Sequence, residues 1–166
     1  MIKQCTAAAL LAATATMSLS ALAAREEHTF EVTVTVPTRS FYIVPVDTTW
    51  IHREQILPWN ITTSRLDGLR KYFDVRHDTS AIEARLEEQA YLSNGRPADD
   101  IALRVRFNGV ELSHIIEPRL VVTAADAAVG SRVLLEIDPL PPAGGYRPGD
   151  YYGNVLLLFN ARAPGG

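Results

Sequence analysis

Strict alternation of apolar and polar residues marks the segment 28–36, which reads HTFEVTVTV. A period of two that is rich in β-branched residues predicts a β-strand. Pro37 ends this pattern, because proline cannot donate a ladder hydrogen bond. One face of the strand carries all its large apolar side chains, which are Phe30, Val32, Val34 and Val36.

Short strands separated by turn residues are predicted along the rest of the chain. Segment 82–88 fits either a helical turn or a strand, and a strand is favoured because Arg85 and Gln89 leave a helical face incomplete. Asn108-Gly109 is typical of a tight hairpin. With no long helix, this spacing predicts an all-β, antiparallel sandwich. The strands are expected at 41–46, 71–75, 82–88, 101–107, 110–112, 119–123, 132–137 and 151–159.

Residues 1–23 have the pattern of a cleaved signal peptide. Lys3 precedes the apolar run 6–19, and Ala21-Leu22-Ala23 forms a small-residue cleavage site. The apolar run is too short and too rich in alanine for a membrane span, which needs about 20 strongly apolar residues. The sequence therefore predicts export.

Composition limits the classes of protein to which this chain can belong. The chain has 166 residues, 47% of them apolar and 21% charged, which indicates one globular domain. The net charge of −3, from 16 basic and 19 acidic residues, argues against nucleic-acid binding. The single cysteine, Cys5, excludes a disulfide framework and a zinc site built from cysteines.

Motifs that carry catalysis are missing from the sequence. It contains no nucleophile elbow, no metalloprotease helix motif and no phosphate-binding glycine loop. The acidic pairs Glu87-Glu88 and Asp99-Asp100 are adjacent, so on a strand their carboxylates point to opposite faces. The sequence thus predicts a protein that is not an enzyme and needs no cofactor or metal.

Two tryptophans support an alternative function. Trp50 and Trp59 could line the sugar-binding surface of a secreted, monomeric β-sandwich, although packing in or around the core is the favoured interpretation. Near the other end, residues 155–159 are continuously apolar, which suggests apolar neighbours on both faces. Such a strand at a sheet edge needs a partner. From the pattern alone, an ordinary hairpin of 28–36 with 41–46 also remains open.

Several of these segments together resemble a known family. The strand 28–36 before a proline, FYIVPV at 41–46, the hairpin at 101–112 and the closing GGYRPGDYYGNVLLLF resemble major pilin subunits of the alpha (class 5) chaperone–usher fimbriae, the colonization-factor-antigen type. The closing match falls on Pro148, Gly149, Tyr152, Gly153, Val155 and Leu157.

The resemblance implies an immunoglobulin-like sandwich that lacks one strand and is completed by donor-strand complementation from a neighbouring subunit. Residues 24–37 would form the donor extension, and residues 38–166 the incomplete domain. Phe30, Val32, Val34 and Val36 would be the donor side chains. The acceptor groove and C-terminal strand would comprise Tyr152, Gly153, Val155, Leu157 and Phe159.

The resemblance also implies partners and a location. The subunit would polymerise into an adhesive surface fibre, in contact with neighbouring copies of itself and with a tip adhesin. A periplasmic chaperone and an outer-membrane usher would handle it on its way through the periplasm to the cell surface.

Overall fold

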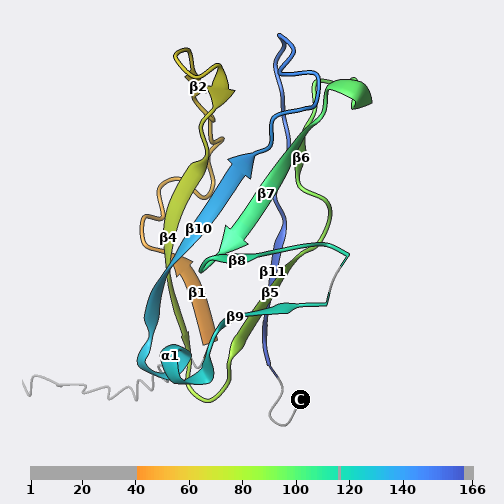
Figure 1. The fold of residues 1–166 in the computed structure, drawn as a ribbon. Coiled ribbons are helices and arrows are strands. Elements are labelled where there is room, and N and C mark those ends of the chain that lie inside the picture. The colour runs from red at the N-terminus through yellow and green to blue at the C-terminus, as the bar shows by residue number, and fades with distance from the viewer. Residues whose placement is uncertain (1–40, 116, 163–166) are drawn as a thin grey trace, which may run out of the picture. The chain divides into compact units, whose positions relative to one another are not determined.

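A computed structural model describes residues 41–115 and 117–162. Its larger sheet has the strand order β1-β4-β10-β7-β6, and β8 also pairs with β7. Figure 1 shows β1, β4, β10 and β7 side by side. The bounds of these strands are Phe41–Pro45 (β1), Leu69–His77 (β4), Ser131–Pro139 (β10), Ile101–Phe107 (β7), Tyr91–Leu92 (β6) and Val110–Glu111 (β8).

The second sheet has three strands in the order β11-β5-β9, with bounds Leu157–Ala161, Ile82–Leu86 and Arg119–Val122. A separate hairpin joins β2 (Trp59–Asn60) to β3 (Arg65–Leu66). Two short helices complete the elements, η1 at Pro97–Asp99 and α1 at Ala124–Val129. All strand pairs in the described residues are antiparallel.

The core lies between the two sheets and follows the period-two pattern of the strands. In β7, for example, Ile101, Leu103, Val105 and Phe107 are buried, whereas Arg104 is exposed. Alternate residues bury their apolar surface against the facing sheet. This burial stabilises the fold by about 25 cal/mol per Å² of apolar surface removed from water. The largest fully buried side chains are Phe107, Ile82, Ile101, Val75 and Val105.

The order β1-β4-β10-β7 against β11-β5 is that of an immunoglobulin-like sandwich. In that fold a further strand pairs with the one corresponding to β11. Among the residues that the structure describes, β11 pairs with β5 alone. The predicted all-β, immunoglobulin-like antiparallel fold is confirmed.

Local predictions can be compared with the strands directly. Segment 82–88 is a strand, as predicted, and the hairpin after β7 has Asn108 and Gly109 at φ values of +51° and +76°. Both positive φ values match the turn type that connects two adjacent strands most tightly. Pro45 lies in β1, an edge strand, as proline requires. The sequence did not predict the short strands β2, β3 and β6 or the helix α1.

The prediction of one strand over 151–159 is wrong, because only residues 157–161 form β11. The segment that faces residues 151–159 crosses from β5 in the second sheet to β6 in the first. Between the Leu86–Leu157 pair and the Ser93–Tyr152 bridge, this segment has six residues (87–92), whereas the C-terminal segment has four (153–156). This unequal count prevents a continuous ladder, and pairing resumes only at Tyr152.

Candidate functional site

The two sheets are joined along one side of the sandwich. The chain passes from β5 in the second sheet to β6, which pairs with β7 in the first. β9 lies on this same side, because it contacts β8, and β8 pairs with β7. β11 is at the opposite end of the second sheet, so its edge lies on the side of β1. Within the described ranges no strand joins the two sheets on the side of β1 and β11, and we call that side of the sandwich the open side.

Side chains that face the core along the open side are less covered than those in the centre. Ile43 on β1 and Leu157 and Phe159 on β11 pack against the core but are only half-buried. Phe41, also on β1, is 38% exposed. By contrast, Val75 and Ala84, which pair with Ile43 and Phe159, are completely buried. The same sheet faces are therefore closed at the centre and incompletely covered at the edge.

A row of four aromatic rings connects the centre of the core to the open side. Trp50 contacts Phe73 edge-on at 5.9 Å between ring centroids, Phe73 contacts Phe107 at 5.7 Å, and Phe107 contacts Phe159 at 4.9 Å. Tilted rings at these distances are favourable for aromatic pairs. Phe159 therefore joins the edge strand directly to the most buried ring of the core.

The acceptor residues expected from the sequence fall into two groups. Val155, Leu157 and Phe159 pack against the core, but only Leu157 and Phe159 lie in β11. Tyr152 is 67% exposed and lies beyond β11, where its backbone exchanges two hydrogen bonds with Ser93 at 2.8 and 3.0 Å. Leu156 is 44% exposed, so the prediction of apolar neighbours on both faces of this segment is wrong at that residue.

Gly153 lies where two backbone segments approach closely. A Cβ atom there would overlap the carbonyl oxygen of Tyr91. Glycine at 153 thus allows the C-terminal segment to lie against β6. The predicted signal peptide and the donor residues Phe30, Val32, Val34 and Val36 lie outside the described residues.

The two tryptophans do not share a surface. Trp50 packs against the core, with the ammonium group of Lys71 5.0 Å from its ring centroid. Trp59, on the β2–β3 hairpin, contacts Tyr146 edge-on at 5.3 Å. A single sugar-binding platform made of both tryptophans, as the alternative function required, is therefore not formed.

The outer face of the larger sheet carries a charged ladder that the sequence analysis did not identify. Arg132 on β10 binds Asp74 on β4 through two hydrogen bonds of 2.8 and 3.2 Å, and these bonds lower the pKa of Asp74. Arg70 and Arg106 flank Glu136 and Asp138 from the neighbouring strands. The alternation of arginine with apolar residues in β7 indicates that its arginines lie on the outer face of the sheet. Which carboxylates these arginines contact is seen only from the register of β7 against β10.

Asp138 is the best-paired carboxylate of this ladder. Partial burial alone would raise its pKa, but hydrogen bonds from Arg70 and Arg106, at 2.6 and 2.9 Å, outweigh that effect and hold the pKa below 3.8. A Cβ atom on Gly68 would lie 2.6 Å from Asp138 Oδ1. Glycine at 68 therefore leaves room for the Arg70–Asp138 pair.

Other chemistry is sparse in the part of the chain that the structure describes. There, no three His, Cys, Asp or Glu side chains come together as a metal site would require. None of its helices has the length and apolar character to cross a bilayer.

Comparison with known proteins agrees with this architecture. Residues 26–160, well over half of the chain, match the family described as CS1 type fimbrial major subunit. The fold is similar to that of the CooA pilin subunit from enterotoxigenic Escherichia coli, with a TM-score of 0.60, 18% sequence identity, and coverage of 73% of this chain and 86% of that one. No curated protein sequence matches the chain. The resemblance to fimbrial subunits of the colonization-factor-antigen type is confirmed. The chain thus belongs to the CS1 type fimbrial major subunits, as a structural, non-enzymatic subunit that associates with other pilin subunits in an extracellular fimbria.

Proposed function

We propose that this subunit polymerises by donor-strand exchange, with residues 28–36 of one copy filling the open side of the next. The supporting observation is the half-burial of Ile43, Leu157 and Phe159 along two facing sheet edges. A strand placed there would pair its backbone with the free edge of β11. Its alternate side chains would then cover the core between β11 and β1.

The donor sequence has the chemistry that this position needs. Phe30, Val32, Val34 and Val36 would point inward, each contributing about 1.5–3 kcal/mol on burial, or about 6–12 kcal/mol together. That range is similar to the whole stability of a small domain. The isolated subunit is therefore marginal and the polymer very stable. Because donor and acceptor are different surfaces, the contact propagates as an open filament.

This scheme assigns the remaining partners and the route. Residues 1–23 direct export and are removed, which leaves 24–37 as the donor extension of the domain 38–166. A periplasmic chaperone covers the open side before assembly, since an exposed apolar edge would aggregate. An outer-membrane usher exchanges the chaperone for a donor strand, and a tip adhesin ends the fibre.

The test compares charges on the two faces of the donor strand. Val34→Asp places a carboxylate in the apolar core, whereas Thr33→Asp places the same group on the opposite face. Electron microscopy and denaturant-resistant ladders on gels should show fibres for Thr33→Asp and none for Val34→Asp. Deleting residues 24–36 should also leave monomers only. Normal fibres from the deletion, or equal yields from the two aspartate variants, would contradict the proposal.

A further inference from the structure

Two adjoining cavities lie beside the β2–β3 hairpin and the 140–150 connection. The first has a volume of about 350 Å³ and the second about 390 Å³. Leu66 and Tyr146 line both, so the two cavities adjoin at these side chains. We call the two cavities together the Arg–Tyr groove. It does not include the open side on which the proposed function depends.

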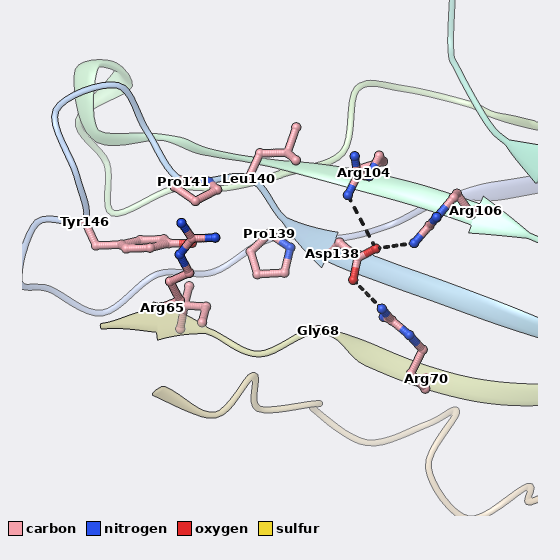
Figure 2. A pocket seen from close by; sticks show the side chains of 11 residues that line it. Arg65, Gly68, Arg70, Arg104, Arg106, Asp138, Pro139, Leu140, Pro141 and Tyr146 are labelled. Atoms are coloured by element: carbon pink, nitrogen blue, oxygen red, sulfur yellow. Dashed lines mark hydrogen bonds and ion pairs between the residues drawn. The ribbon is translucent and has the colours of Figure 1, made fainter. Parts of the chain in front are cut away.

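One end of the groove is rich in guanidinium groups. Figure 2 shows Arg70, Arg104 and Arg106 directed toward Asp138, with nitrogen–oxygen distances of 2.6, 4.0 and 2.9 Å. Arg70 and Arg106 also contact Glu136 at 3.3 and 3.2 Å. With Arg65, four cations line this end of the groove, against two carboxylates. The local excess is positive in a protein whose net charge is −3.

Several donors at this end lack an acceptor in the described part of the chain. Arg65 makes no hydrogen bond or ion pair there, and Arg104 comes no closer than 4.0 Å to Asp138, which is beyond hydrogen-bond distance. Arg106 Nε and Tyr146 Oη are buried without a hydrogen-bond partner. Buried hydrogen-bond donors normally have partners, and a guanidinium group carries donors but no acceptor. The missing chemistry is therefore an acceptor, best supplied by an anion.

The other end of the groove is aromatic. It is lined by Trp59, Tyr146 and Tyr151, together with Pro148 and Gly149. Trp59 is 47% exposed, although its edge is fixed against Tyr146. A half-exposed ring with a polar neighbour offers a flat apolar contact in water, as ligand sites for amphipathic molecules do. A pyranose ring has such an amphipathic face.

We propose that the Arg–Tyr groove binds an acidic saccharide. Its carboxylate or sulfate group lies between Arg65 and Arg104, which Figure 2 places on either side of Pro139. Its sugar ring lies against Tyr146 and Trp59. The anionic group supplies the acceptors that the arginine end lacks, and the ring covers the exposed tryptophan.

The test uses assembled fibres of the full chain and three immobilised probes, 3′-sialyllactose, 3′-sulfolactose and lactose, in biolayer interferometry. At least one acidic probe should bind more tightly than lactose, and raising the salt concentration should weaken that binding. A preference for the sialylated or the sulfated probe identifies the acidic group. Equal binding of all three probes, or no binding, would overturn the proposal.

Variants locate the binding in the groove. The double variant Arg65→Gln/Arg104→Gln should lose at least about tenfold in affinity, since one charged hydrogen bond contributes about 1.5–3 kcal/mol. Arg53→Gln removes the same charge from an exposed loop outside the groove and should bind as the parent does. Electron microscopy of each sample shows that fibres are present, so a failure of assembly is distinguished from a failure of binding. Unchanged binding by the double variant, or an equal loss in Arg53→Gln, would refute the site.

Discussion

The centre of the sandwich and its open side are built from the same kinds of side chain but differ in their cover. Phe107 at the centre is completely buried and has an aromatic ring on either side of it, Phe73 and Phe159. Phe159 at the edge contacts Phe107 yet remains half-buried. Both belong to one continuous aromatic row, so composition does not distinguish the two regions.

What distinguishes them is the number of neighbouring strands. β7 and β10 are paired on both sides, whereas β1 and β11 each pair on one side within the described residues. A residue on an edge strand loses the cover that the next strand would give. The difference therefore arises from the topology of the sheets, and one further strand on the open side would remove it.

Replacement of Phe107 by alanine should have the largest effect. Removing a fully buried phenylalanine costs about 3–5 kcal/mol, from lost burial and from the cavity that remains. The loss should be the same for the subunit lacking residues 24–36 with or without a synthetic 28–36 peptide, because Phe107 is already closed. Urea denaturation of both forms measures it. A loss that depends on the peptide would mean that the centre is also incomplete.

Replacement of Phe159 by alanine should have a smaller effect that depends on the donor strand. In the subunit lacking residues 24–36 we expect a loss of about 1–2 kcal/mol, because the ring is only half-buried there. With the 28–36 peptide added, the loss should rise to about 3 kcal/mol, because the ring is then covered.

The same urea denaturation, run with and without peptide, measures this difference. Leu158→Ala is the matched control, since Leu158 lies on the same strand but on its outer face. Its loss should not change when peptide is added. If the loss for Phe159→Ala is also independent of the peptide, the donor strand does not cover the open side at this ring.

The sequence predicted strands correctly where a local pattern of alternating apolar residues is enough to define the strand. Residues 101–107 form a strand as predicted, since alternation and a following Asn-Gly turn agree. The final strand was placed too early, because its register depends on how the chain crosses from β5 to β6, and no local pattern records that crossing.

The candidate sites show the same limit. Val155, Leu157 and Phe159 were predicted as acceptor residues from the family resemblance; all three pack against the core, and their acceptor role stays a prediction. The Arg–Tyr groove was not found, because Arg65, Arg104 and Tyr146 are far apart in the sequence and only the sheet register and the hairpin bring them to one cavity. Single arginines in alternating strands resemble ordinary solvated charges until their neighbours are known.

Substitution in the charged ladder on the outer face of the larger sheet should have the smallest effect, and its dependence on pH shows whether the carboxylate charge is stabilising. The pKa of Asp138 is lower in the folded chain than its ordinary value of 3.8, despite partial burial, because Arg70 and Arg106 donate to its carboxylate. Folding therefore favours the ionised form, and this stabilisation is present above the unfolded pKa and is lost as pH falls through the folded one. Asp138→Asn should lower stability at pH 7 by less than about 1 kcal/mol, because Glu136 still pairs with both arginines.

Urea denaturation of both proteins from pH 7 to pH 2 measures this contribution. The difference between parent and Asp138→Asn should shrink as pH falls below about 4, because the parent loses the charge that the variant already lacks. Asp150→Asn is the control, since Asp150 is exposed and makes no ion pair in the described part of the chain. A difference for Asp138→Asn that stays constant over the whole range would mean that hydrogen-bond geometry, and not the carboxylate charge, stabilises this face. The charge of Asp138 would then add nothing to the stability of the larger sheet, and the contrast between its centre and the open side would be one of apolar cover only.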